Sequence, residues 1–461
     1  MRIELPDKVR RIIRTLQENG HEAYAVGGCV RDSLLGRIPE DWDITTSADP
    51  YETRELFPRT IDTGIKHGTV TIMMGKEGFE VTTYRIDGEY EDGRHPKQVS
   101  FTKSLKEDLA RRDFTINAMA YNDADGLVDI FGGAEDLERK VIRCVGDPGC
   151  RFDEDALRIL RAFRFAAQLN FQIDEATLTA AAERAANLKL ISAERIHTEL
   201  NKLLLSAHPE LLIEAYRAGL TKVFLPEFDR MMEESTASLK GQRSGIHAAA
   251  VIRALDLASA SGSASDSCGQ QERDTCDPKN RISASCLEKK QRLILAIAAL
   301  LAPAGEEAAA AVLRRLKYDN DTIAAVRRLT RFYAYSWTLD PAGMRRSMYE
   351  IGPEYMERLF LLQRAEDIVS GGIREQELSK AQELWLGVVE RGECVSLKML
   401  AVNGGDLMRA GHAQGRTLGD TLDTLLKAVL ERPEWNEKEQ LLSLAAKTAA
   451  SARTADEKDR E

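Results

Sequence analysis

Cysteine is scarce in this chain, and its spacing argues against two common kinds of site. The 461 residues include 7 cysteines, an odd number, and no Cys-x-x-Cys pair. A disulfide framework or a zinc knuckle would need paired or closely spaced thiols. The first residues, MRIELPDKVRRIIRTLQENG, predict a charged amphipathic helix instead of a signal peptide. We therefore expect a reduced, cytoplasmic protein.

Long apolar runs and an excess of positive charge are also missing. No apolar stretch is long enough to span a bilayer, so we expect no membrane partner. The net charge of −10 is unusual for a protein that binds nucleic acid, because phosphate contacts depend on lysine and arginine. The segment LRRLKYDNDTIAAVRRLTRF, residues 313–332, is locally basic. An RNA substrate would require a one-sided basic face of this kind.

The chain is long enough to form several hydrophobic cores. With 43% hydrophobic residues over 461 positions, two to four domains are expected. Strand and βα-turn patterns fill about the first 148 residues, and the later Ala/Leu/Glu/Arg stretches predict helices. A Ser/Gly/Asp-rich insert at about 258–288 and the terminal residues 451–461 are predicted to be disordered. Three cysteines lie in or beside the insert: Cys268, Cys276 and Cys286. We interpret them as exposed thiols, and metal binding is the alternative.

A compact group of glycines and carboxylates is the most informative feature that is present, in AYAVGGCVRDSLLGRIPEDWDITTSADP. Alternate residues of a strand point to one face, so Asp41 and Asp43 could converge on the same cation. Magnesium prefers oxygen ligands and is usually held by one or two carboxylates plus substrate phosphates. We therefore expect Asp41 and Asp43 to be catalytic Mg²⁺ ligands. Glu80 is either a third carboxylate or an ordinary acid on a strand face.

The residues just upstream suit a phosphate group. Residues 23–26 predict a strand, Gly27 and Gly28 allow close backbone approach, and CVRDSLLG predicts a helix start. Backbone N–H groups there would cradle phosphate oxygens, with Arg31 expected in the first helical turn. Taken singly, a Gly-Gly turn is more often a tight connection. The order and spacing of these features therefore carry the prediction of nucleotide binding by Gly28 and Arg31.

Three further segments follow in order along the chain. They are LARRDFTINAMAYN (109–122), RFDEDALRILRAFRFAAQLNF (151–171) and ISAERIHTELNKLL (191–204). Together with the glycine and aspartate segment, they resemble the motifs of the class II tRNA nucleotidyltransferases, the CCA-adding enzymes and their poly(A) polymerase relatives. Looser matches continue through SLKMLAVNGGDLM and WNEKEQLL.

The resemblance implies an α+β fold with four parts. An N-terminal nucleotidyltransferase head of the polymerase-β-like α/β type, with a mixed sheet, would span residues 1–148. An all-α neck (149–215), body (216–345) and tail (346–450) would follow. The neck would bind the nucleotide base and the tail would bind tRNA. Three tail residues are plausible phosphate contacts but are equally consistent with solvated surface: Lys398, Arg409 and Arg416.

The resemblance also implies a protein template for the incoming base. We expect residues 153–165 to form one helix starting at Asp153 or Glu154, with Asp155 and Arg158 at i, i+3 on one face. An ordinary surface ion pair is the alternative. Cytosine and adenine both offer an amino donor beside a ring-nitrogen acceptor, which one Asp and one Arg can read. Guanine and uracil reverse this pattern, leaving polar groups mismatched at ~1–3 kcal/mol each.

The neighbouring polar residues receive supporting roles. Each three-residue step drifts about 60° around a helix, so Arg161 and Arg164 are assigned to the sugar or triphosphate of the nucleotide. Arg112 is assigned to the triphosphate by the family pattern, and Glu154 to fixing the arginine fork. For three residues of the same motif, a purely structural role is at least as good an interpretation. Asp113 and Thr115 could cap a helix, and Asn117 could be a buried hydrogen-bonding residue.

The implied reaction is stepwise addition of CCA to the tRNA 3′ end from CTP and ATP. Magnesium would assist in-line attack of the 3′-hydroxyl, and pyrophosphate would leave. The loop DGEYEDGRHPKQVSF, residues 87–101, favours addition of the full CCA, because relatives that add only two cytidines have a shorter loop. The alternatives are an A-adding enzyme, a CC-adding enzyme, a poly(A) polymerase, or a non-catalytic RNA-binding protein on this scaffold. No obligatory protein partner is inferred.

Overall fold

The computed structural model describes residues 2–88, 99–234, 243–261 and 288–447. The chain divides into two compact units. The first contains residues 1–235 with the short segments 243–249 and 312–318, and the second contains the remainder. The loop residues 89–98, most of the predicted insert and the terminus 451–461 lie outside the described residues. Helix α13 (Ser244–Ser261) extends a few residues past the predicted insert boundary at about 258, and Ala258 is buried in it.

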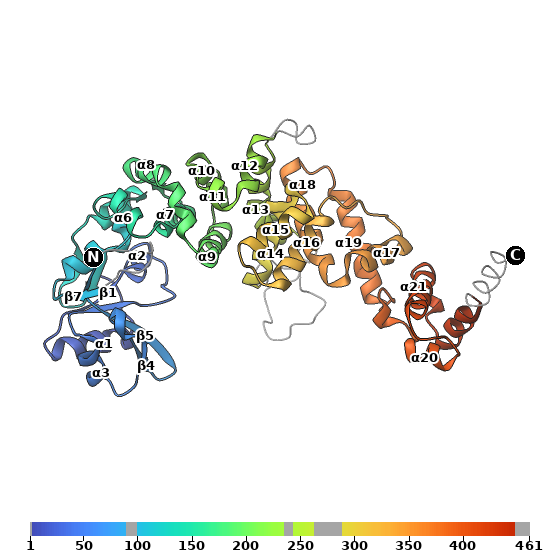
Figure 1. Cartoon of the computed structure of the whole chain (residues 1–461), viewed down its shortest axis with the longest axis horizontal. Helices are drawn as coiled ribbons and strands as arrows, with labels where there is room; N and C mark the ends of the chain where they lie inside the picture. Colours follow the sequence, from blue (N-terminus) through green and yellow to red (C-terminus); the bar gives the residue numbers. More distant parts are fainter. Residues whose placement is uncertain (1, 89–98, 235–242, 262–287, 448–461) are drawn as a thin grey trace, which may run out of the picture. The chain divides into compact units, whose positions relative to one another are not determined.

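A mixed seven-stranded sheet forms the N-terminal part of the first unit, as predicted (Figure 1). Its strand order is β3-β4-β5-β2-β1-β8-β9. Strands β2 and β5 are parallel, and the other neighbours are antiparallel. The strands are β1 Ala23–Val26, β2 Ile44–Thr46, β3 Thr60–Gly64, β4 Thr69–Met74, β5 Glu77–Thr83, β8 Met119–Asn122 and β9 Gly126–Asp129.

Helices cover this sheet because their apolar residues recur at helical spacing. The predicted amphipathic helix is α1 (Asp7–Glu18), whose buried stripe recurs at i, i+3, i+4 and i+7. Tyr24 and Val26, which share one side of β1, pack with Leu105 and Leu109 of α4 (Leu105–Ala110). The remaining elements of this part are α2 Gly28–Leu34, α3 Pro50–Leu56, β6 Arg85–Asp87, β7 Val99–Phe101 and α5 Gly133–Arg139.

Helices dominate after residue 148, again as predicted. One exception is β11 (Gln172–Ile173), which pairs with β10 (Val141–Ile142), so the predicted all-α neck also contains a short strand. In the first unit the helices are α6 Pro148–Glu154, α7 Leu157–Leu169, α8 Glu175–Glu183, α9 Ala193–Leu204, α10 Leu212–Arg217, α11 Thr221–Phe224 and α12 Pro226–Glu233.

The second unit is helical wherever the structure describes secondary structure in it (Figure 1). No described helix is long and apolar enough to cross a membrane. Helices α13 and α15 each contribute residues to both units. The helices are α14 Lys289–Leu301, α15 Glu306–Arg315, α16 Asn320–Arg331, α17 Pro341–Ile351, α18 Met356–Ser370, α19 Glu375–Glu390, α20 Gly404–Arg409 and α21 Arg416–Glu431.

Candidate active site

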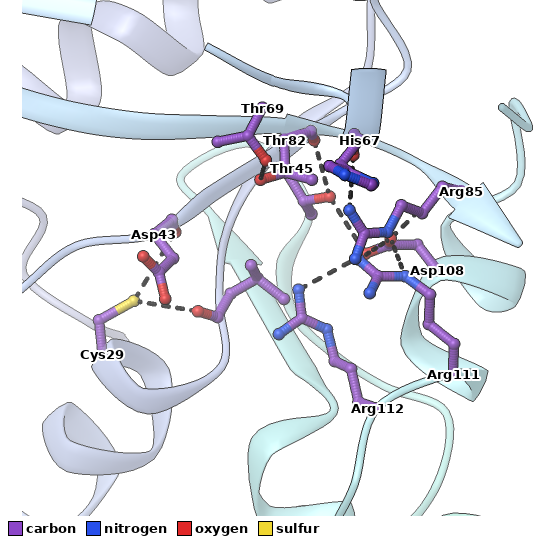
Figure 2. Close-up of polar contacts among 11 residues, drawn as sticks. Cys29, Asp43, Thr45, His67, Thr69, Thr82, Arg85, Asp108, Arg111 and Arg112 are labelled. Carbon is purple, nitrogen blue, oxygen red and sulfur yellow. Dashed lines mark hydrogen bonds and ion pairs between the residues drawn. The ribbon is translucent and has the colours of Figure 1, made fainter. Parts of the chain in front are cut away.

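The two aspartates lie just before a central strand of the sheet. Strand β2 begins at Ile44, so the expectation that Asp41 and Asp43 belong to the strand itself is wrong. The backbone is nevertheless already aligned with β1 there, because the carbonyl of Asp43 accepts a hydrogen bond of 3.0 Å from the amide of Val26. Both aspartates are exposed. Behind them, the buried thiol of Cys29 donates to the carbonyl of Asp43 (Figure 2).

The electrostatics of the pair suit a divalent cation. Partial desolvation raises the pKa of Asp43, with Arg112 opposing this effect and the charge of Asp41 adding to it. Two carboxylates that repel each other, with no nitrogen or sulfur ligand required, fit a hard cation that binds through oxygen. Among the described residues, no three His, Cys, Asp or Glu side chains lie close enough together to hold a metal. The structure therefore gives no support to Glu80 as a third carboxylate.

The glycine turn lies between two guanidinium groups. Gly27 has φ 83° and ψ −126°, which non-glycine residues rarely adopt. A Cβ atom on Gly27 would lie 3.0 Å from Nη1 of Arg112, and one on Gly28 would lie 3.7 Å from Nη2 of Arg31. Arg31 belongs to the last turn of the seven-residue helix α2, not the first turn as predicted. The turn therefore places backbone that a ligand can approach closely next to two positively charged side chains.

Replacing Gly27 by alanine should lower nucleotide incorporation more than replacing Gly28. The left-handed backbone would cost ~1–3 kcal/mol, and the new Cβ would displace the Arg112 guanidinium. Gly28→Ala is the matched control, because Gly28 starts a helix and has more room. Steady-state incorporation and thermal unfolding of both variants would check this. Equal effects of the two substitutions would contradict it.

A buried hydrogen-bond network links this turn to the following motif. The Arg31 guanidinium donates to the amide oxygen of Asn117 at 2.7 Å, and Asn117 donates to Asp113 at 3.2 Å. Asn117 is thus the buried hydrogen-bonding residue that was predicted. Asp113 also accepts from Arg161 at 2.8 Å. Thr115 donates to Asp136 at 2.6 Å, and neither Asp113 nor Thr115 caps the short 3-10 helix Thr115–Asn117.

Asp113→Asn should destabilise the protein at neutral pH and much less in acid. Burial alone would raise the pKa of Asp113, but its ion pair with Arg161 lowers it to about 2. A lowered acid pKa contributes stability above the unfolded value of about 4, and this contribution is lost as pH falls through the folded pKa. We expect a loss on the order of 2 kcal/mol at pH 7 that shrinks by about half near pH 3. Urea unfolding of both proteins at the two pH values would test this, and a pH-independent difference would refute it.

Asp155 and Arg158, the predicted base-reading pair, lie at a break between two helices. The predicted single helix from Asp153 is wrong, because α6 ends at Glu154 and α7 begins at Leu157. The break arises at Asp155, whose backbone is extended and whose carboxylate accepts a hydrogen bond of 3.0 Å from the amide of Leu157. The same carboxylate pairs with Arg195 of α9 at 2.7 Å. Sequence reasoning missed Arg195, although it lies within ISAERIHTELNKLL.

Arg158 is fixed by three groups. Its guanidinium donates to the carboxylate of Glu154, as predicted, and to the carbonyls of Arg151 at 3.2 Å and Arg111 at 3.0 Å. The residue is 9% exposed. These contacts define the direction of the guanidinium without any ligand. Arg158 therefore has the rigidity that a template residue needs.

The other two arginines of the row contact carboxylates. Arg164 pairs with the buried Glu199 of α9 at 2.7 Å, and Arg161 lies between Asp113 and Glu199. Burial lowers the pKa of Arg164 to about 10. Both guanidiniums lie near the ring of Phe165, as does that of Arg31. Arg161 thus links Asp113 to α9, and Arg164 pairs with α9 alone. The assignment of both arginines to the sugar or triphosphate stays a prediction.

Three family models match successive parts of the chain and together cover most of it. Residues 23–143 match the family described as poly A polymerase head domain. Residues 170–232 match the probable RNA and SrmB-binding site of polymerase A, and residues 288–445 match a putative tRNA nucleotidyltransferase domain 2.

Full-length relatives and a solved structure show the same similarity. The CCA-adding enzyme of Limosilactobacillus fermentum is 36% identical over 440 residues, covering 95% of this chain and 96% of its own length. That of Enterococcus faecalis is 36% identical over 440 residues, covering 95% and 94%. The crystal structure of the Bacillus stearothermophilus CCA-adding enzyme in complex with CTP is 28% identical, with a TM-score of 0.72 over 98% of this chain and 100% of that one. The chain therefore belongs to the CCA-adding enzymes, a family of tRNA nucleotidyltransferases with a poly(A) polymerase head domain.

Proposed function

We propose that this chain adds C, C and A to the 3′ end of tRNA, using CTP and ATP and releasing pyrophosphate. The observation that carries the proposal is one local arrangement. Asp43 lies beside a glycine turn that is flanked by the guanidiniums of Arg31 and Arg112. Carboxylates for a cation and cationic groups for a triphosphate are the two requirements of nucleotidyl transfer.

Asp41 and Asp43 are the proposed ligands of a divalent cation, and Mg²⁺ is the ion that best suits two carboxylates plus phosphate oxygens. A cation bound there would activate the attacking 3′-hydroxyl and stabilise the charge of the leaving pyrophosphate. Gly28 offers close backbone approach to the phosphates. Arg112 adds positive charge on the same side as Asp43, since the two groups interact electrostatically.

Asp155 and Arg158 are the proposed template for the base. An ionised carboxylate only accepts hydrogen bonds and offers about four lone-pair directions. Leu157 and Arg195 together donate three hydrogen bonds to Asp155, so about one direction is left for the amino group of cytosine or adenine. Arg158 would donate to the neighbouring ring nitrogen. Uracil and guanine would present a carbonyl to Asp155 and an N–H to Arg158, and both contacts would fail.

The remaining assignments concern the whole molecule. We propose the head at residues 1–148, the neck at 149–215, the body at 216–345 and the tail at 346–450, with the neck binding the nucleotide base and the tail binding tRNA. Helix α16 is one-sided, since Ile323, Val326 and Leu329 are buried while Arg327 and Arg331 are exposed. Arg327 pairs with Glu306 and Glu307, so its charge is partly balanced. A reduced, cytoplasmic location is consistent with the four described cysteines, which are free thiols: Cys29, Cys144, Cys150 and Cys394.

Product length on a gel would test the function. The protein is incubated with tRNA lacking its last one, two or three nucleotides, and CTP and ATP are supplied singly and together. Addition of only the missing residues is the expected result. Long adenosine tracts would indicate a poly(A) polymerase, and addition of only A or only C would indicate a specialised relative. The absence of any product would favour a non-catalytic RNA-binding protein.

A further inference from the structure

Asp108 of α4 is a fully buried carboxylate at the centre of the head, outside the residues proposed above. It has no exposed surface. Its carboxylate accepts hydrogen bonds from the hydroxyl of Thr45 at 3.1 Å and from the backbone amide of Arg85 at 3.4 Å. It also pairs with Arg111 at 2.8 Å and with Arg112 at 3.5 Å (Figure 2). One acid thus joins four donors from three parts of the chain.

Three of these four donors lead to different parts of the site. Thr45 lies on β2, two residues beyond Asp43. The Arg112 guanidinium reaches the turn at Gly27, where it limits the space for any side chain. The carbonyl of Arg111 accepts a hydrogen bond of 3.0 Å from Arg158. Displacement of Asp108 would therefore disturb three places together: strand β2 next to Asp43, the Arg112 guanidinium at the glycine turn, and the support of Arg158.

The charge of the group favours an anionic ligand. Asp108 carries one negative charge and pairs with two guanidiniums, so these three side chains together keep a net positive charge. Arg112 also interacts with the charges of Asp43 and Asp113. The pair with Arg111 is short and the pair with Arg112 is long. Burial by itself raises the pKa of Asp108, but Arg111 and Arg112 bring it below the ordinary value, so the acid is ionised at neutral pH. Arg112 is therefore oriented by Asp108 while much of its charge remains available to a phosphate.

We infer that Asp108 is a positioning residue that couples triphosphate binding to base selection. It sets the guanidinium of Arg112 beside the glycine turn. It also pairs with the side chain of Arg111, and so helps to position the Arg111 carbonyl that accepts a hydrogen bond from Arg158. This inference rests on the proposed function, because it needs Arg112 at the triphosphate and Arg158 at the base. It adds a role for a residue that contacts neither ligand.

Asp108→Asn tests the inference, because asparagine keeps the shape of aspartate but loses its charge. Since small misplacements of binding groups can cost about 100-fold, we expect KM for CTP and ATP to rise about ten-fold or more. We also expect the ratio of kcat/KM for CTP over UTP to fall by about ten-fold, because Arg158 loses part of its support. Single-nucleotide incorporation into tRNA with each triphosphate measures both quantities.

Asp136→Asn is the matched control. Asp136 is a buried acid of the same head, 4% exposed, held by Thr115 at 2.6 Å and Arg143 at 3.2 Å. Its replacement should lower the unfolding temperature and leave the CTP-to-UTP ratio unchanged. Thr45→Val is a milder second variant, which removes one donor to Asp108 and should shift KM and the ratio in the same directions by smaller factors.

The outcomes separate this inference from the proposed function. Loss of stability in Asp108→Asn and Thr45→Val with unchanged KM and an unchanged ratio would overturn the coupling and leave a purely structural acid. If Asp108→Asn does not fold, Thr45→Val alone decides by the same two readouts. A wild-type protein that incorporates no nucleotide would instead overturn the proposed function.

Discussion

Asp43→Ala is expected to abolish nucleotide incorporation while leaving tRNA binding nearly unchanged. A carboxylate that holds a cation at the reacting phosphate stabilises the transition state by several kcal/mol. We therefore expect kcat to fall on the order of 10³-fold or more. The tail, which is proposed to bind tRNA, is untouched by this substitution. Primer extension under single-turnover conditions, together with a gel-shift titration of tRNA, would measure the two properties separately.

Asp62→Ala is the control for this variant. Asp62 is an exposed aspartate of β3 in the same sheet, paired with Arg54 at 3.4 Å across the surface. Its removal should change incorporation little, because exposed ion pairs contribute about 0–1 kcal/mol. Retained turnover by Asp43→Ala would refute the metal assignment, as would equal losses in the two variants.

The unfolding temperature of an Asp43→Asn variant shows whether a loss of activity comes from a lost metal ligand or from a destabilised fold. Partial desolvation and the charge of Asp41 raise the pKa of Asp43, although Arg112 opposes this. An acid whose folded pKa is raised weakens the folded state once pH exceeds its unfolded pKa. Asp43→Asn should therefore unfold at a higher temperature than the wild type at pH 7 in chelator. A lower unfolding temperature would contradict this electrostatic description of the site.

Arg158→Ala is expected to remove discrimination between CTP and UTP while retaining a measurable reaction. Without the guanidinium, the ring N–H of uracil no longer meets a donor, and cytosine loses the hydrogen bond to its ring nitrogen. At ~1–3 kcal/mol per mismatched group, the ratio of kcat/KM for CTP over UTP should fall by about 10- to 100-fold or more. Incorporation of each nucleotide into tRNA lacking its last three residues measures this ratio.

Arg139→Ala is the control for the template prediction. Arg139 is an exposed arginine at the end of α5, paired with Glu135 at 2.6 Å. Loss of this surface pair should leave both CTP incorporation and the CTP-to-UTP ratio near wild type. If Arg158→Ala still rejects UTP as the wild type does, Asp155 and Arg158 are not the template.

Patterns within short segments were predicted well. The strand Ala23–Val26 and the helix Asp7–Glu18 follow from runs and periodicities that lie within a few residues. The contact between Glu154 and Arg158 was also predicted, and it forms although a helix break separates the two residues. The helix break at Asp155 was not, since the helical pattern of the segment gives no warning of a side chain that caps the next amide.

Partners distant in the chain could not be predicted. Asp155 meets Arg195 40 residues later, and Thr45 meets Asp108 across 63 residues. A signal for Asp108 did exist, because it stands three and four residues before Arg111 and Arg112 at helical spacing. That spacing predicts an ordinary surface pair, and only the fold buries it.

The sequence by itself determined the family, the mixed head with helices after it, and the residue types of the site, because short-range periodicity and motif order are properties of the chain alone. Only the tertiary structure decided which acid orients which arginine. Asp108 meets its arginines at the end of α4, and α9 brings Glu199 to Arg164 and Arg195 to Asp155. Burial then gives these ion pairs their effect, because charges removed from water need their partners far more than charges at the surface do.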